Sequence, residues 1–163
     1  MTINSAAILY FSPTGTTKKI SHAIIQAMNI EATKTINLTS PDVRNTRMNS
    51  IDEDILLIAI PVYAERVPEM VLPFLSNLTG NGKPVILVTV YGNIGDGMAL
   101  DELYSIAKKA GFHVVGAGTF IGEHSFSTSE VPIAENRPNR EDLAIAEEFG
   151  RHILKKLQND DHE

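Results

Sequence analysis

Three short apolar runs, each of strand length and made of residues that favour strands, limit the folds open to this chain more than any other feature. They occupy residues 6–11, 55–60 and 85–90, and none shows a clean alternation of apolar and polar side chains. A strand with one wet face alternates, whereas a parallel strand covered on both faces is apolar almost throughout. The three runs therefore predict the centre of a parallel sheet with helices on both faces.

Two weaker runs complete the expected sheet. The run at 32–38 is interrupted by polar residues, and the run at 113–121 by two glycines, so both are expected at the edges. Alternating strands and helices imply right-handed crossovers between parallel strands. With the second and fifth strands at the edges, the predicted order is 2-1-3-4-5.

Helical periodicity fills the intervals between the strands. Apolar residues recur at the spacing of one buried helix face in three stripes: Ile20, Ala23, Ile24, Ala27 and Met28; Val71, Phe74, Leu75 and Leu78; and Leu100, Leu103, Tyr104 and Ala107. Pro73 leaves the start of the second of these helices open. A short helical turn is expected at Ser40-Pro41, and a last helix is expected to begin at Asn139, a good capping residue.

The predicted strand order creates a crevice at one edge of the sheet. The chain reverses direction between the first and third strands, and ligands of such sheets usually lie at the carboxyl ends of those strands. The loops expected there are S-P-T-G-T-T at 12–17, P-V-Y-A-E-R at 61–66 and Y-G-N-I-G-D-G at 91–97. These three loops are therefore where the function should be sought.

The first loop places four hydroxyl side chains and a glycine at the start of a helix. The hydroxyls belong to Ser12, Thr14, Thr16 and Thr17, and Gly15 lets the backbone curl around a ligand. Unpaired amides and the helix dipole attract an anion to such an end. A plain helix cap explains one or two hydroxyls, but it explains four poorly. We predict a phosphate site, although the loop is neither the G-x-x-x-x-G-K-[ST] nor the G-x-G-x-x-G nucleotide motif.

The second and third loops each contribute a tyrosine. Tyr63 and Tyr91 can stack on a planar ring, although either could simply pack on the domain with its hydroxyl in water. Glycines and Asn93 in the third loop expose backbone that can reach the edge of a ligand. Beside a phosphate site, this combination favours a flat heterocycle joined to a phosphate.

Composition and charge narrow the possibilities further. At 163 residues the chain is expected to form one domain, residues 1–158, followed by a polar tail at 159–163. It has no cysteine, which excludes disulfides, thiolate metal sites and cysteine nucleophiles, and its histidines show no metal-binding spacing. The formal net charge of -6 disfavours nucleic acid and fits a basic partner. The sequence shows neither a membrane span nor a signal peptide, so a cytoplasmic location is expected.

The three loops resemble those that bind FMN in the flavodoxin family, and the similarity extends over essentially the whole chain. More narrowly, the sequence is similar to the flavodoxin-like half of proteins that fuse this domain to a ferredoxin. The segments that carry this second resemblance are F-S-P-T-G-T-T, P-V-Y-A-E-R-V-P, V-Y-G-N, and G-E-H-S-F together with N-R-P. The cysteine-rich ferredoxin half is missing here, so the chain is either a stand-alone relative or a fragment.

The resemblance implies a flavodoxin-like three-layer sandwich that binds FMN noncovalently and transfers electrons at low potential. Its partner would be a ferredoxin or a reductase. The implied phosphate contacts are Ser12, Thr14, Gly15, Thr16 and Thr17. The implied ring contacts are Pro61, Val62, Tyr63, Tyr91, Gly92, Asn93, Ile94 and Gly95.

Two alternatives stay open at this point. An FMN-dependent reductase of quinones or similar small acceptors would use the same site, and a flavin-free interaction module would keep only the fold and an anion. Arg66 is expected to meet a flavin carbonyl, a partner's carboxylate or solvent. The segment His124-Ser125-Phe126 either closes the outer edge of the flavin or packs on the domain. The long connection at 122–139 is the expected partner-facing or substrate-facing rim.

Overall fold

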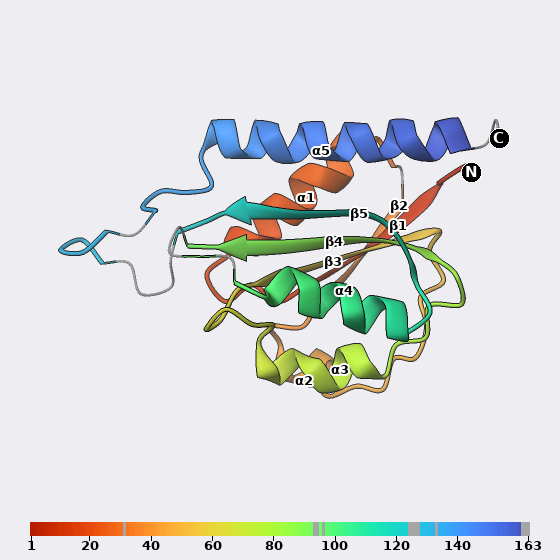
Figure 1. Cartoon of the computed structure of the whole chain (residues 1–163), viewed down its shortest axis with the longest axis horizontal. Helices are drawn as coiled ribbons and strands as arrows, with labels where there is room; N and C mark the ends of the chain where they lie inside the picture. Colours follow the sequence, from red (N-terminus) through yellow and green to blue (C-terminus); the bar gives the residue numbers. More distant parts are fainter. Residues whose placement is uncertain (31, 93–94, 96, 124–127, 133, 161–163) are drawn as a thin grey trace.

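The computed structural model describes residues 1–30, 32–92, 95, 97–123, 128–132 and 134–160. Within them, a parallel sheet of five strands runs in the order β2-β1-β3-β4-β5 (Figure 1). The strands are β1 (Ser5–Tyr10), β2 (Ala32–Asn37), β3 (Ile55–Pro61), β4 (Pro84–Tyr91) and β5 (His113–Ile121). The predicted order and the edge positions of the second and fifth strands are confirmed, and the fold is the flavodoxin-like α/β sandwich.

Helices cover both faces of the sheet. On one face lie α1 (Thr16–Ala27) and α5 (Arg140–Asn159), and on the other lie α2 (Pro41–Arg44), α3 (Leu72–Ser76) and α4 (Ala99–Lys109) (Figure 1). A single 3-10 turn, η1 (Glu69–Val71), leads into α3 and places Pro73 in the first turn of that helix, where its missing amide costs nothing. α5 includes Asn159, the first residue of the predicted tail.

The sheet separates two apolar cores. Along β1, Ala6 and Ile8 face the core beneath α1 and α5, whereas Ala7 and Leu9 face the core beneath α3 and α4. Every residue from Ile55 to Ile60 of β3 is at most 1% exposed. Because both faces are covered, neither face needs polar side chains, which explains the unbroken apolar runs. Each fully buried aliphatic side chain contributes about 1.5–3 kcal/mol.

Most residues of the predicted helical stripes are buried, although Ala27 and Leu100 are half-buried and one residue is exposed. Leu103 and Ala107 of α4 are buried, but Tyr104 is 45% exposed and its predicted place on the buried face is wrong. The buried line of α4 instead passes through Ala99, Leu103 and Ala107 at a spacing of four residues. Tyr104 lies one residue further round the helix, beside this buried line.

Close packing of α5 depends on glycines. A Cβ atom at Gly150 would lie 2.3 Å from the Ile24 carbonyl oxygen, so α1 and α5 approach through a bare backbone. A Cβ at Gly116 of β5 would lie 2.6 Å from Cδ1 of Ile153. The glycine that marked β5 as a weak strand in the sequence therefore admits a side chain of the covering helix.

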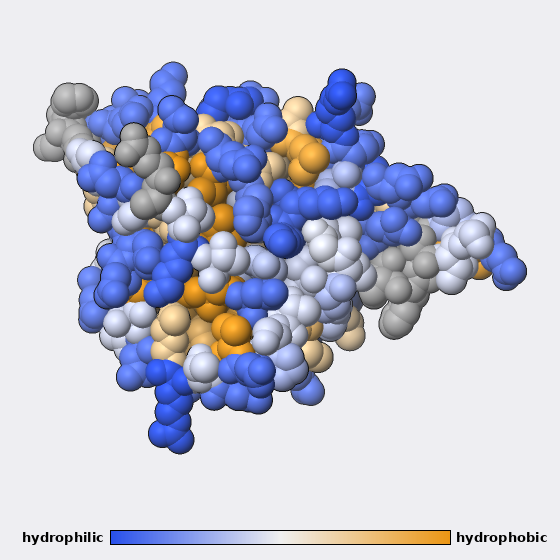
Figure 2. Space-filling view, turned by 180° about the vertical axis from the view of Figure 1, so that it is seen from behind, coloured by the Kyte–Doolittle hydropathy of each residue, from blue (hydrophilic) through white to orange (hydrophobic). Residues whose placement is uncertain are grey.

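The start of α5 matches the predicted cap. Asn139 accepts a hydrogen bond from the Asp142 amide at 3.0 Å, and Asp142 accepts one from the Asn139 amide at 2.8 Å. This reciprocal capping box satisfies two amides at once. No helix in the described part of the chain is long and apolar enough to span a bilayer. Seen from behind, polar side chains surround narrow apolar strips on the surface (Figure 2).

Candidate functional site

The loops after β1, β3 and β4 meet at a single hollow beyond the carboxyl ends of the strands. The empty space between its walls, including open solvent at the mouth, is about 390 Å³. Its walls are formed by Pro13, Thr14, Thr16, Thr17, Pro61, Val62, Tyr63, Val90, Tyr91, Gly92 and Glu123. Most of the site residues predicted from the sequence are thus brought together, although their contacts with a ligand stay predictions.

Some predicted residues lie elsewhere. Ser12 is outside the lining; its hydroxyl accepts a hydrogen bond from the Lys18 amide at 3.0 Å, and its own amide donates to Thr39 Oγ1 at 2.8 Å. Ser12 therefore supports the first turn of α1. Gly95 is exposed and is not part of the lining. Asn93, Ile94 and the segment 124–126 are outside the described residues.

The beginning of α1 is built to receive hydrogen-bond acceptors. Gly15 caps the helix with a φ of 86°, a left-handed conformation that favours glycine. The Ser12 hydroxyl already satisfies the Lys18 amide, whereas the amides of Thr16 and Thr17 meet no acceptor among the described residues. Such amides carry the positive end of the helix dipole. With the exposed hydroxyl of Thr14, they make this end of the hollow suitable for an anion.

The second wall is a tight turn in an unusual conformation. Tyr63 and Arg66 exchange two backbone hydrogen bonds of 2.9 Å, which closes a two-residue turn. The two central residues, Ala64 and Glu65, have φ values of 47° and 65°. Residues other than glycine adopt this region at a cost of about 1–2 kcal/mol each. Neighbouring contacts must therefore hold the turn in place.

Those contacts come from α4 and the residues just before it. Glu102 accepts hydrogen bonds from Arg66 Nε at 2.6 Å and from the Val67 amide at 3.0 Å, and it also pairs with the Arg66 terminal nitrogen. The Met98 amide donates to the Glu65 carbonyl at 2.8 Å. A Cβ at Gly97 would lie 2.3 Å from the Cβ of Glu65, so only glycine allows this approach. Arg66 is therefore engaged within its own chain.

The Tyr63 ring is fixed against the body of the protein. It packs edge-to-face on Phe11, with ring centroids 6.0 Å apart and an interplanar angle of 81°. Burial raises the pKa of the Tyr63 phenol, so the side chain is neutral at physiological pH. Tyr91 lies half-buried on the adjacent loop and also lines the hollow. The two tyrosines thus supply aromatic walls to the hollow whose other end is suited to an anion.

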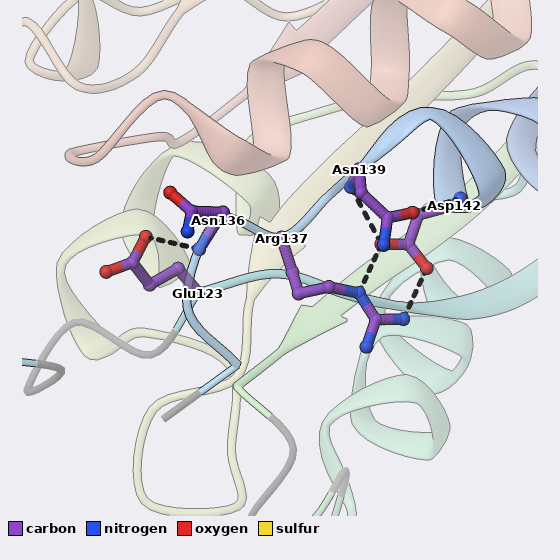
Figure 3. Close-up of polar contacts among 5 residues, drawn as sticks. All are labelled: Glu123, Asn136, Arg137, Asn139 and Asp142. Atoms are coloured by element: carbon purple, nitrogen blue, oxygen red, sulfur yellow. Dashed lines mark hydrogen bonds and ion pairs between the residues drawn. The ribbon is translucent and has the colours of Figure 1, made fainter. Parts of the chain in front are cut away.

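Sequence reasoning missed Glu123. This residue follows β5 and lines the hollow, and its carboxylate accepts a hydrogen bond from the Asn136 amide at 3.2 Å (Figure 3). Gly122 brings the segment close to α1, since a Cβ there would lie 3.1 Å from the Cβ of Thr16. The position of Glu123 in the sequence could have indicated this place, because a residue directly after a parallel strand lies at the same edge of the sheet as the other loops. Pro13 and Val90 also line the hollow and were not predicted as site residues.

Comparisons with known proteins support the fold. No family model and no curated protein matches the sequence. Among solved structures, the flavodoxin of Megasphaera elsdenii superposes with a TM-score of 0.60 at 22% identity, covering 92% of this chain and 98% of that one. The Streptococcus pneumoniae flavodoxin gives a TM-score of 0.65 at 18% identity, covering 93% and 99%. A rubredoxin oxygen:oxidoreductase from Desulfovibrio gigas gives 0.62 at 14% identity, covering 96% of this chain and 36% of that one.

Proposed function

We propose that this protein binds FMN noncovalently in the hollow and transfers electrons between partner proteins. The observation that carries the proposal is that an end suited to an anion and two aromatic side chains line one hollow. The free amides at the start of α1 adjoin walls that contain Tyr63 and Tyr91. When bound, FMN supplies the one-electron and two-electron redox chemistry, and the protein supplies the binding site. The similarity to flavodoxin structures favours this ligand over other aromatic phosphates.

The anion-binding end fits a phosphate monoester without a lysine. The amides of Thr16 and Thr17 are two donors, and the hydroxyls of Thr14 and Thr16, which share one hydrogen bond at 3.4 Å, leave a third. Hydrogen bonds to a charged group contribute about 1.5–3 kcal/mol each. This set can therefore anchor the phosphate without a positively charged side chain.

The remaining walls fit a planar ring. Tyr63 and Tyr91 offer aromatic surface, and the uncharged Tyr63 phenol does not repel an electron-rich ring. The Val62 amide is bonded to the Val90 carbonyl at 2.9 Å, so only the carbonyl of Val62 can serve a ligand. Gly92 adds bare backbone to the lining.

The charges of the chain affect both the reduction potential of a bound flavin and the choice of redox partner. The lining contains one carboxylate, Glu123, and no lysine or arginine. Such surroundings disfavour added negative charge on a bound flavin and lower its reduction potential. The net charge of -6 favours a basic redox partner, for which a ferredoxin or a reductase of basic surface is our proposal.

Titration with FMN tests the proposal directly. The apoprotein is expected to quench flavin fluorescence on binding, to shift the visible absorbance bands, and to give a one-to-one endpoint. Riboflavin, which lacks the phosphate, should bind far more weakly. A chain that leaves the FMN spectrum and fluorescence unchanged at high protein concentration would exclude both the carrier and any FMN enzyme, leaving the flavin-free module.

The open mouth of the hollow favours a second candidate, an FMN-dependent reductase of small acceptors such as quinones. A substrate could reach a ring held there without a partner protein. Rapid steady-state oxidation of NADH or NADPH with a quinone by the FMN-loaded protein would support this activity. Turnover seen only after a reductase is added would support the carrier.

A further inference from the structure

Glu123 stands out as a carboxylate beside a site suited to an anion. It lines the hollow together with Thr14 and Thr16, and the adjacent Gly122 packs against Thr16. A negative charge so close to a bound phosphate would weaken binding unless it made a compensating contact. Its presence in the wall therefore calls for a ligand group that donates hydrogen bonds without carrying a negative charge.

Arg137, in the segment that is hydrogen-bonded to Glu123, does not pair with its carboxylate. The guanidinium of Arg137 forks onto both carboxylate oxygens of Asp142 and lies away from Glu123 (Figure 3). This contact, chiefly a hydrogen bond, lowers the pKa of Asp142 and keeps that carboxyl ionised. Asp142 also accepts the Asn139 amide at the start of α5. The positive charge of Arg137 is therefore paired with Asp142, and this contact anchors the segment to the start of α5.

The backbone of Asn136 and Arg137 also fixes Glu123. The Glu123 amide donates to the Arg137 carbonyl at 2.8 Å, and the Asn136 amide donates to Glu123 Oε2 at 3.2 Å. Among the described residues, no donor reaches the second carboxylate oxygen, Oε1. Glu123, a residue of the lining, is therefore fixed through Oε2 and keeps Oε1 as a strong acceptor for a ligand.

We propose that Glu123 binds hydroxyl groups of the chain that links the phosphate of the ligand to its ring, and that Arg137 is the positioning residue that holds it there. The inference rests on the proposed function. Glu123 is next to the phosphate-binding turn, whereas Tyr63 and Tyr91 form the neighbouring walls. In FMN, the ribityl chain occupies the corresponding place between phosphate and ring, and its hydroxyls are neutral donors. The pair would select a hydroxylated linker over a plain alkyl one.

A comparison of two ligands separates this role from general stability. The first ligand is FMN, and the second is its phosphopentyl analogue, in which ring and phosphate are kept and the linker hydroxyls are replaced by hydrogen. Loss of hydrogen bonds to a charged acceptor lowers affinity by roughly 10- to 100-fold. We expect the unaltered protein to prefer FMN by that factor, measured as the ratio of the two dissociation constants.

Variants then show which residues cause the preference for FMN over the analogue. Glu123→Gln keeps the shape and an oxygen for the Asn136 amide, yet is expected to reduce the preference to a few-fold. Glu130→Gln, which removes an exposed acid of the same connection outside the hollow, should leave it unchanged. Arg137→Met should lower FMN affinity while analogue affinity stays the same, because mere loosening of the fold would weaken both ligands. Thermal unfolding of each variant checks that the domain is intact.

The outcomes separate the two proposals. If Glu123→Gln retains the full preference for FMN, or if the unaltered protein shows no preference, Glu123 is not the hydroxyl acceptor, and FMN binding still stands. If Arg137→Met weakens both ligands equally, Arg137 has no positioning role. If the unaltered protein binds neither ligand, the proposed function and this inference are both overturned.

Discussion

Glu102 and Arg66 join the first turn of α4 to the turn that carries Tyr63. The carboxylate takes the guanidinium on one oxygen and the Val67 amide on the other, at 3.0 Å. The Glu102 side chain is 16% exposed, whereas that of Arg66 is 59% exposed, so the carboxylate is the better-fixed member. An acid of α4 thereby holds Ala64 and Glu65 in conformations that they would not adopt by themselves.

The first prediction concerns this contact. Glu102→Gln removes the charge that holds Arg66, and the cost in unfolding free energy is expected to be about 1 kcal/mol, since Arg66 is largely exposed. FMN affinity should fall more than stability suggests, because Tyr63 loses its fixed position. Urea unfolding and flavin titration measure the two effects. Asp101→Asn, at the neighbouring exposed position of the same helix, is the control, and equal FMN binding by both variants would show that the contact does not position Tyr63.

The second prediction tests the phosphate-binding turn. Thr14→Asp places a negative charge at the anion-binding end of the hollow, and at the short distance to a phosphate it should lower FMN affinity by roughly 100-fold or more. Thr14→Asn has nearly the same shape without the charge and should cost much less. Fluorescence titration compares them. Equal dissociation constants for the Asp and Asn variants would mean that the phosphate lies elsewhere.

The third prediction concerns the contact between α1 and α5. In an exposed helix, changing glycine to alanine gains about 1 kcal/mol. Gly150→Ala should instead destabilise the protein by about 1–3 kcal/mol, because the new Cβ would lie 2.3 Å from the Ile24 carbonyl oxygen. Ala144→Gly, at an exposed position of the same helix, measures the difference in helix propensity between alanine and glycine alone. It should lower the free energy of unfolding by about 1 kcal/mol. A stabilised Gly150→Ala protein in chemical denaturation would contradict the close helix approach.

The fourth prediction follows from the lowered pKa of Asp142. The hydrogen bond from Arg137 favours the ionised carboxyl, so the folded-state pKa lies below the usual value of 3.8. The resulting stabilisation is present above pH 3.8 and is lost as the pH falls through the folded-state value. Asp142→Asn removes it, so the difference in unfolding free energy between the two proteins should shrink from pH 5 to pH 3. A difference that is constant over this range would show that the ionised form is not favoured by folding.

The sequence predicts the frame of the molecule well because burial on both faces leaves a strong pattern. The residues from Ile55 to Ile60 are apolar without interruption since each is enclosed by helices on either side. The chain reversal between the first and third strands then fixes where the loops meet. Tyr104 was misplaced because a partly exposed tyrosine resembles a core residue in a periodic pattern.

The site was harder to predict, because several of its determinants are contacts between distant segments. The Ser12 hydroxyl accepts a hydrogen bond from the Lys18 amide and keeps its own O–H for donation, a division that the sequence does not reveal. Arg66 has two acids close to it in sequence, Glu65 and Glu69, yet its partner is Glu102, 36 residues away. Glu123 acquires its place through Asn136, across a long connection. Residue type and spacing indicate what a loop can bind, but they do not show which groups the fold has already engaged.

The hydrogen bonds between Glu123 and the Asn136–Arg137 segment also have a practical meaning for protein engineering. They fasten the two ends of the long connection to each other beside the sheet. When the ends of a loop are already held together, each doubling of its length costs only about 0.6 kcal/mol. Its outer turn, where the Thr128 amide donates to the Val131 carbonyl, is therefore a suitable point at which to insert a reporter peptide or a fused domain.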